Sequence, residues 1–170
     1  MTTSKIAQSK RTVQQNRSSP GAEYRPLDVF VGNWNLEGQQ YDGPFGPDAK
    51  IVGVESYEWL AGGFFLIHRL GGRLDTSEIA CIEIIGFDES SQNYPRYTFY
   101  NNGRTNEWQS QKTDAGWTII GDSVMADTTF KIRCTTLFSD SGNEMTSKWE
   151  YSSDGSNWKA FWDVRAVKAA

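Results

Sequence analysis

The sequence predicts an all-β protein: a single antiparallel up-and-down β-barrel of about ten strands, with a short helical turn before the first strand. Strand-like runs with alternating apolar and polar residues follow one another through residues 33–167, and no segment of useful length has helical periodicity. Turns rich in Gly, Asn and Asp separate these runs. Closure into a barrel is expected because it removes the unpaired edges that an open sheet of this size would expose.

The chain has 170 residues, of which 38% are hydrophobic, so it is long enough for one domain with a core and too short for two. No run approaches the roughly 20 apolar residues that a membrane helix requires, and no apolar segment typical of a secretory signal opens the chain. We therefore expect a cytoplasmic protein without a membrane partner. Cys81 and Cys134 stand in separate strand-like runs without a C-x-x-C pair, which indicates two reduced structural thiols.

Charge is distributed unevenly along the chain. Residues 1–25 have a net charge of +4 and the whole chain −4, so the remainder has −8. Residues 1–25 are predicted to be a basic, flexible tail, and residues 26–170 a β-barrel domain. The composition of the tail also resembles an organelle transit peptide, and that alternative stays open. Because an acidic barrel repels phosphate backbones, no nucleic-acid partner is expected.

A short helical turn is predicted at residues 26–32, because proline at its start and glycine at its end are typical helix boundaries. Ten strands are predicted after it, joined by turns whose Gly, Asn and Asp residues tolerate a positive φ. Because the links are short, successive strands should be antiparallel neighbours. The predicted strands span residues 33–41, 50–60, 63–71, 78–87, 95–101, 104–111, 116–121, 127–138, 143–152 and 157–167.

Alternation along the strands predicts which side chains point into the barrel. Trp34 opposes polar neighbours in the first strand, and His68 belongs to the apolar face of the third. The fourth strand is apolar on both faces except for Glu83, so its register stays open. The last strand is also ambiguous, with Trp162 on one face and Phe161 on the other.

A helical turn that leads into Gly-x-Trp at Gly32 and Trp34, with Arg165 near the end of the last strand, resembles the calycin superfamily of lipocalins, fatty-acid-binding proteins and nitrobindins. More narrowly, the chain resembles the bacterial domain-of-unknown-function family DUF1579 over about residues 27–168. This resemblance implies a ten-stranded barrel but no agreed reaction. The motifs that carry it are Phe30-Val31-Gly32-Asn33-Trp34, Glu58-Trp59-Leu60-Ala61-Gly62-Gly63-Phe64-Phe65-Leu66 and Ile85-Gly86-Phe87-Asp88.

The calycin resemblance implies that Trp34 packs beneath Arg165 and closes one end of the barrel. Physical chemistry supports this structural role, because a guanidinium group can stack on an indole face while its N–H groups bind backbone carbonyls. The two side chains would then seal an opening that otherwise admits water.

Aromatic residues make up 14% of the chain, and many of them fall on predicted strands. They can simply fill a core, since strands favour aromatic side chains. A ten-stranded barrel, however, is wider than its own side chains fill and tends to keep a cavity, which suits a flat, mainly apolar ligand. The candidate ligand-binding residues are Tyr57, Trp59, His68, Tyr97, Tyr100, Trp108, Met145 and Trp149.

His68 and Glu83 are the candidate catalytic residues. His68 is the only histidine, which excludes a two-histidine metal site, and no Asp/His/Ser motif surrounds it. An inward His68 can act as an acid or base or bind a haem, or it can be a buried histidine bonded to a carbonyl. An inward Glu83 would be desolvated and its pKa raised. The alternatives are that Glu83 is a surface carboxylate or that it pairs with an arginine such as Arg96 or Arg104.

No metal or other cofactor is expected. Nitrobindin-like barrels bind haem through a histidine late in the chain, so the resemblance to them raises the possibility of haem. No histidine follows His68 here, and haem binding is therefore disfavoured.

Three classes of function stay open. The first is a barrel that binds a small hydrophobic or aromatic molecule, favoured because no recognisable catalytic set is present. The second is a cofactor-independent cyclase, isomerase or dehydratase acting on a small substrate such as a natural product, with Tyr57 and Tyr100 beside the catalytic pair. The third is a protein-interaction module or homodimer, which would fit Trp158 and Trp162 if they lie outside the barrel.

Overall fold

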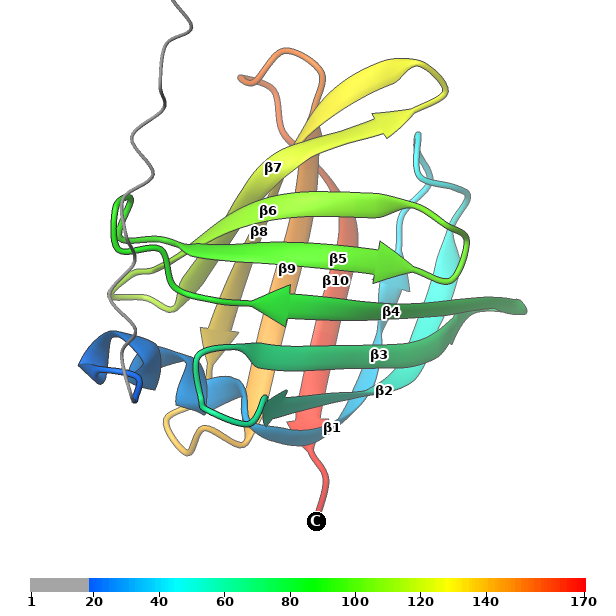
Figure 1. Cartoon of the computed structure of the whole chain (residues 1–170). Helices are drawn as coiled ribbons and strands as arrows, with labels where there is room; N and C mark the ends of the chain where they lie inside the picture. The colour runs from blue at the N-terminus through cyan, green and yellow to red at the C-terminus, as the bar shows by residue number, and fades with distance from the viewer. Residues whose placement is uncertain (1–18) are drawn as a thin grey trace, which may run out of the picture.

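The computed structural model describes residues 19–170, which form a closed barrel of ten antiparallel strands (Figure 1). Each strand pairs with its neighbour in the sequence, and β1 pairs with β10 to close the barrel. This up-and-down topology confirms the predicted fold class. The elements are η1 (Ala22–Phe30), β1 (Gly32–Gln40), β2 (Ala49–Trp59), β3 (Leu66–Leu74), β4 (Ser77–Ile85), β5 (Tyr94–Tyr100), β6 (Thr105–Lys112), β7 (Trp117–Met125), β8 (Thr128–Phe138), β9 (Glu144–Ser152) and β10 (Lys159–Lys168).

The 3₁₀-helix η1 closes one end of the barrel. Tyr24, Leu27 and Phe30 recur every three residues, which is the repeat of a 3₁₀-helix, so all three side chains share one buried face. The turn predicted at residues 26–32 therefore begins earlier, within the predicted tail. Residues 1–18 of that tail lie outside the described part of the chain. None of the helices in the described part is long and apolar enough to cross a membrane.

The strands lie close to their predicted positions, although β7 continues to Met125 beyond its predicted end at residue 121, and β3 begins later than predicted. The prediction begins this strand at residue 63, but Gly62 and Gly63 both have a positive φ. Gly63 donates its backbone N–H to the carbonyl of Leu60 and so belongs to a turn. The Gly-Gly pair therefore precedes β3, which begins at Leu66.

Trp34 is buried at the closed end, but the predicted stacking of Arg165 on its indole is wrong. Arg165 points outward, with 47% of its side chain exposed, and binds Glu37 and Glu144. The cation over the Trp34 ring is Lys168, whose Nζ lies 5.1 Å from the ring centroid. Register explains the difference, because Trp34 pairs with Lys168 across the β1–β10 ladder.

The last strand contains an irregularity that alternation does not reveal. Pairing between β9 and β10 shifts register between Ala160 and Trp162. Because an extra residue reverses the alternation of a strand, Phe161 and Trp162 both line the interior, where opposite faces were predicted. Trp158 instead lies under the guanidinium of Arg133, 4.3 Å from Cζ to its ring centroid. Trp162 therefore forms no outer pair with Trp158, so these tryptophans do not support the interaction-module hypothesis.

The register of β4, which the sequence left open, is resolved by its neighbours. Cys81 and Glu83 face the interior, whereas Ile82 is 47% exposed on the outer face. Glu83 pairs with His68 on β3 and with Thr98 on β5, so three polar side chains stand side by side on the inner wall. This juxtaposition forms the centre of the site described next.

Candidate ligand-binding cavity

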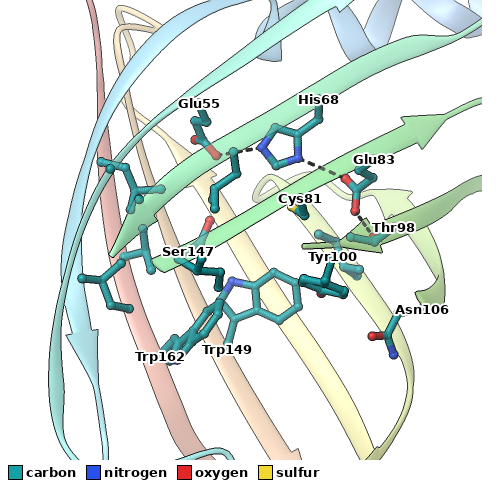
Figure 2. A pocket seen from close by; sticks show the side chains of 18 of the residues that line it. Glu55, His68, Cys81, Glu83, Thr98, Tyr100, Asn106, Ser147, Trp149 and Trp162 are labelled. Atoms are coloured by element: carbon teal, nitrogen blue, oxygen red, sulfur yellow. Dashed lines mark hydrogen bonds and ion pairs between the residues drawn. The ribbon is translucent and has the colours of Figure 1, made fainter. Parts of the chain in front are cut away.

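The barrel encloses a cavity of about 480 Å³ (Figure 2). It extends from Phe30 of η1, at the closed end, to Asn101 and Asn102 in the turn between β5 and β6 at the other end. All ten strands contribute lining residues, because every second side chain of a barrel strand points inward. The interior is therefore a hollow with side chains of two different kinds on its wall.

One side of the cavity consists of an aromatic wall, which we define as Trp108, Trp149, Phe161 and Trp162. The ring centroids of Trp149 lie 6.0 Å from Trp108 and 6.4 Å from Trp162, both in edge-on arrangements. Trp162 is fixed by a 2.7 Å hydrogen bond from its Nε1 to Oε1 of Gln40. Edge-on packing of this kind leaves ring faces available for a further flat group.

Glu55, His68, Glu83 and Arg96 form an ionic tetrad on the cavity wall. Figure 2 shows Glu55, His68 and Glu83 across the cavity from Trp149 and Trp162. His68 stands between the two carboxylates, with Nε2 3.1 Å from Glu55 Oε2 and Nδ1 3.6 Å from Glu83 Oε1. Arg96 Nη1 donates to the same Glu83 oxygen at 2.9 Å. All four side chains are buried, so two acidic and two basic groups compensate one another inside the barrel.

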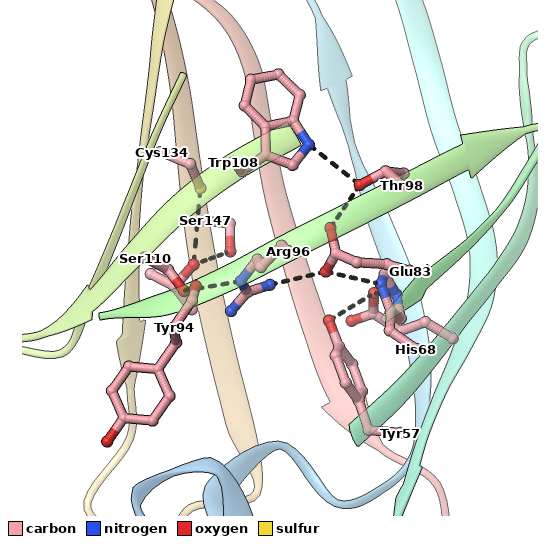
Figure 3. Close-up of polar contacts among 12 residues, drawn as sticks. Tyr57, His68, Glu83, Tyr94, Arg96, Thr98, Trp108, Ser110, Cys134 and Ser147 are labelled. Carbon is pink, nitrogen blue, oxygen red and sulfur yellow. Dashed lines mark hydrogen bonds and ion pairs between the residues drawn. The ribbon is translucent and has the colours of Figure 1, made fainter. Parts of the chain in front are cut away.

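Neighbouring polar side chains hold the tetrad in place (Figure 3). Thr98 Oγ1 donates to Glu83 Oε2 at 2.8 Å and accepts from Trp108 Nε1 at 3.1 Å, so it joins the tetrad to the aromatic wall. Arg96 Nε donates to Ser110 Oγ at 3.0 Å. Register produces these contacts, because Glu83 pairs with Thr98 between β4 and β5, and Arg96 with Trp108 between β5 and β6.

The tetrad shifts the pKa of its members in opposite directions. Burial alone would lower the pKa of His68, but its interactions with Glu55 and Glu83 outweigh burial and raise the pKa to about 9. Burial alone would raise the pKa of Glu83, as expected from the sequence for an inward carboxyl, but Arg96 and His68 lower it to about 2. The predicted rise in the pKa of Glu83 is wrong because the prediction did not include the cations Arg96 and His68 beside this carboxylate. At neutral pH both His68 and Glu83 are therefore charged.

Tyr57 covers one face of the imidazole of His68. The two rings are nearly parallel, with an interplanar angle of 4° and centroids 4.2 Å apart. The Tyr57 hydroxyl lies 3.5 Å from Glu55 Oε2, at the limit of a hydrogen bond. Burial raises the pKa of Tyr57 well above its usual value, so the phenol stays neutral. His68 is thus held at its edges by carboxylates and on one face by a neutral ring.

The residues present do not fit a haem or another metal. A histidine ligates through a ring nitrogen with a free lone pair, but both nitrogens of His68 face carboxylates and its raised pKa keeps a proton on each. Within residues 19–170, no group of three or more His, Cys, Asp or Glu side chains is arranged to hold a metal ion.

The sequence profile of DUF1579, whose description is protein of unknown function, matches residues 19–166. The chain belongs to the DUF1579 family. Among solved structures it is similar to the crystal structure of Rv2717c from M. tuberculosis, with 10% sequence identity, a TM-score of 0.55, and coverage of 88% of this chain and 99% of that chain. At this identity the likeness concerns the fold alone. No curated protein matches. The narrower predicted resemblance is confirmed, and membership of the calycin superfamily stays a prediction.

In this DUF1579 barrel, the cavity wall contains Glu83 and six of the eight residues that the sequence singled out for ligand binding. Whether they bind a ligand stays a prediction. These six residues are Tyr57, His68, Tyr100, Trp108, Met145 and Trp149.

Two predicted ligand-binding residues lie elsewhere in this DUF1579 structure. Tyr97 is 45% exposed on the outer face, because its neighbour Thr98 takes the inward position of β5. Trp59 packs at the closed end, where its Nε1 donates to Oδ1 of Asp28 on η1 at 2.9 Å. Both therefore lie outside the cavity wall, contrary to the predicted lining.

Sequence reasoning missed three important parts of the cavity. Glu55 has the same parity as Tyr57 on β2, so alternation contained a signal for its inward position. Arg96 was named as one alternative partner of Glu83 and not as a cavity residue, and the structure shows that pair inside the barrel. Phe161 was missed because the irregularity in β10 has no mark in the sequence pattern.

Proposed function

We propose that this DUF1579 barrel binds a small, electrically neutral, mainly aromatic molecule in its interior. The observation that carries the proposal is the cavity of about 480 Å³ between an aromatic wall and a charge-compensated tetrad. Ligand pockets for small molecules typically have volumes of about 300–1,000 Å³ and apolar walls with a few polar groups. The cavity has both properties.

The apolar part of the wall favours a flat ligand. Aromatic pairs contribute about 0.5–1.5 kcal/mol beyond the burial of their area, and the aromatic wall offers several ring faces and edges to one molecule. Further aliphatic side chains complete this part of the cavity without a charge. They are Leu36, Ile51, Ile119, Ile132, Val164 and Ala166.

The tetrad favours a ligand without a net charge. Its two acidic and two basic side chains already pair with one another, so an ionic group beside the tetrad would meet no free counter-charge there. Arg104, another cation of the cavity wall, is exposed and donates to Ser123. An unpaired charge in such an environment costs several kcal/mol of desolvation. Neutral polar side chains, such as Gln40, Asn106 and Ser147, remain on the wall and suit hydroxyl or carbonyl groups.

Two fluorescent probes test the preference for a neutral ligand. Anilinonaphthalene and anilinonaphthalene sulfonate share one ring system. The second probe has an added sulfonate group, which carries a single negative charge. We expect the neutral probe to bind more than about tenfold more tightly, which corresponds to about 1.4 kcal/mol. Fluorescence titrations measure both affinities, and a preference for the sulfonate would contradict the role given to the tetrad.

A matched pair of substitutions tests whether the probe binds inside the barrel. Val164→Phe enlarges a side chain on the cavity wall, and we expect it to weaken binding of anilinonaphthalene more than about tenfold. Val54→Phe makes the same change on the outer face of β2, where the side chain is 59% exposed, and should leave the affinity unchanged. Leu36→Phe provides a second interior variant if Val164→Phe does not fold. Equal affinities for interior and exterior variants would exclude an interior site.

A second candidate function, catalysis of a cyclisation, isomerisation or dehydration, is supported by Glu55. Its Oε2 faces Tyr57 and His68, which leaves Oε1 as the oxygen that can accept a substrate proton. The ring nitrogens of His68 both face carboxylates, so His68 orients Glu55 instead of reaching a substrate.

Native mass spectrometry of the purified protein can identify a bound compound. An assay for turnover of that compound would then test the catalytic function. We expect Glu55→Gln to lower the rate at least about 100-fold while binding of anilinonaphthalene persists. An unchanged rate would remove Glu55 from any mechanism and leave the barrel as a binding protein.

A further inference from the structure

Exposed apolar side chains lie on the outer surface of the barrel in two places, one on β2, β4 and β5 and the other on β7 and β8. On β8, β9, β10 and β1, outward side chains form ion pairs such as Arg133 with Glu150 and Arg165 with Glu37. On β4 and β5, by contrast, Ile82 is 47% exposed and Phe99 50% exposed. In Figure 1 the outer side of β3, β4 and β5 faces the viewer, and no other described element lies over it. Large exposed apolar patches on soluble proteins mark interaction sites.

Sheet register joins these side chains into one surface. Ile82 pairs with Phe99 and Ile84 with Tyr97 between β4 and β5. Gly71, on the outer face of β3, connects this group to β2, because it pairs with both Val54 and Ala80. We call the whole surface the apolar face, and it consists of Val52, Val54, Gly71, Ala80, Ile82, Ile84, Tyr97 and Phe99.

The apolar face contains both a hollow and a projection. The hollow is centred on Gly71, where an added Cβ would meet no atom within 4 Å. It is lined by Val52, Val54, Arg73, Glu78 and Ala80 as well as by main chain. The projection is formed by the aromatic rings of Tyr97 and Phe99, two strands away on β5.

We propose that two copies of this chain form a homodimer through the apolar face. An isologous interface requires a patch that is complementary to itself, since the same residues meet on both subunits. The face meets this condition in shape, because a two-fold rotation brings the β5 rings of each copy towards the Gly71 hollow of the other.

The charged side chains at the border of the apolar face also favour a second copy of this chain over a partner whose charges all have one sign. Arg69 and Arg73 lie on β3, and Glu58 and Glu78 lie on the flanking strands β2 and β4. Lys50 on β2 adds a third cation, and Glu37 on β1 and Glu107 on β6, which pair with Val52 and Tyr97, add further carboxylates. Both signs of charge therefore border the face, so a second copy can meet charges opposite to its own. A strongly basic or strongly acidic partner would instead meet like charges along part of this border.

A matched pair of isoleucine substitutions tests the dimer. Sedimentation velocity of the wild type should give twice the chain mass of 19.2 kDa at micromolar concentration. Ile82→Glu places a carboxylate in the apolar face and should raise the dimer dissociation constant more than about tenfold. Ile120→Glu makes the same change at a 52% exposed position on β7, outside the face, and should leave the constant unchanged.

Gly71→Leu provides a second test that leaves the interior of the barrel intact. The added side chain has open space and the backbone φ is not positive, so the fold should tolerate it while the hollow is filled. We expect the same weakening of the dimer, with an unchanged thermal unfolding midpoint at a concentration where the wild type is monomeric. A monomeric wild type at every concentration, or dimers that resist both Ile82→Glu and Gly71→Leu, would overturn the proposal. None of these outcomes depends on what the interior binds.

Discussion

At the scale of single residues, the surroundings of His68 determine its charge. Its two carboxylate neighbours raise its pKa to about 9 despite burial, whereas an unfolded chain gives histidine its ordinary pKa of about 6.5. The folded state therefore binds the His68 proton more tightly than the unfolded state. The stability that this group contributes is fully present below about pH 6.5 and is lost as the pH rises through about 9.

We expect the free energy of unfolding to fall by about 3 kcal/mol between about pH 6.5 and 9, measured by urea denaturation. His68→Gln should remove this decline, because no titrating imidazole remains. His68 is the only histidine, so its ring-proton NMR signal can be titrated without ambiguity. A midpoint near pH 6.5, or a decline that persists in the variant, would contradict this description of the tetrad.

Alternation alone predicted that His68 points inward, but it did not predict what the side chain meets there. Glu55, Glu83 and Arg96 approach from three other strands, and one strand's pattern has no information about the register of its neighbours. The predicted direction of the Glu83 pKa shift was wrong for the same reason. Desolvation follows from one residue's burial, whereas charge compensation depends on partners distant in the sequence.

At the scale of elements, the junction of β6 and β7 shapes the aromatic wall. These strands pair only through Gln109–Lys112 and Trp117–Ile120. Beyond the paired part, the Trp108 indole lies against Gly121 on β7, where a Cβ would be 2.6 Å from the ring atom Cε3 and 2.9 Å from the Glu107 carbonyl oxygen. The absence of a side chain at Gly121 therefore allows Trp108 to take its place in the wall.

Gly121→Val should displace the Trp108 ring and destabilise the barrel by about 1–3 kcal/mol, because overpacking forces side chains and backbone to move. We also expect weaker binding of anilinonaphthalene, since the wall loses the position of one of its rings. Gly71→Ala is the control, because its Cβ meets no atom within 4 Å and should change neither property. Urea unfolding and probe titration measure both effects, and equal behaviour of the two variants would show that Trp108 does not depend on Gly121.

The elements themselves were predictable because turns and alternation mark them strongly. All ten strands and the turn before them appear within a few residues of their predicted positions. The exceptions have local causes: the Gly62-Gly63 turn delays β3, and the shift between Ala160 and Trp162 reorients β10. The wrong pairing of Trp34 with Arg165 came from a family resemblance, and the β1–β10 register replaces the arginine with Lys168.

At the scale of the whole molecule, closure of the sheet was predictable and a cavity was expected from the number of strands, but the volume of the cavity was not predictable. Closure follows from one consecutive series of antiparallel strands whose edges must be satisfied. A cavity, by contrast, depends on the summed volume of inward side chains from all ten strands. The barrel also separates two apolar surfaces: an interior one proposed for a ligand and an exterior one proposed for a second copy.

A crystal structure of the protein with anilinonaphthalene bound tests the interior site most directly. The account predicts electron density for the probe inside the barrel, between the aromatic wall and the ionic tetrad, with its rings against Trp149 or Trp162. Density for the probe confined to the outer face of β4 and β5, or an interior filled only by ordered water, would contradict it.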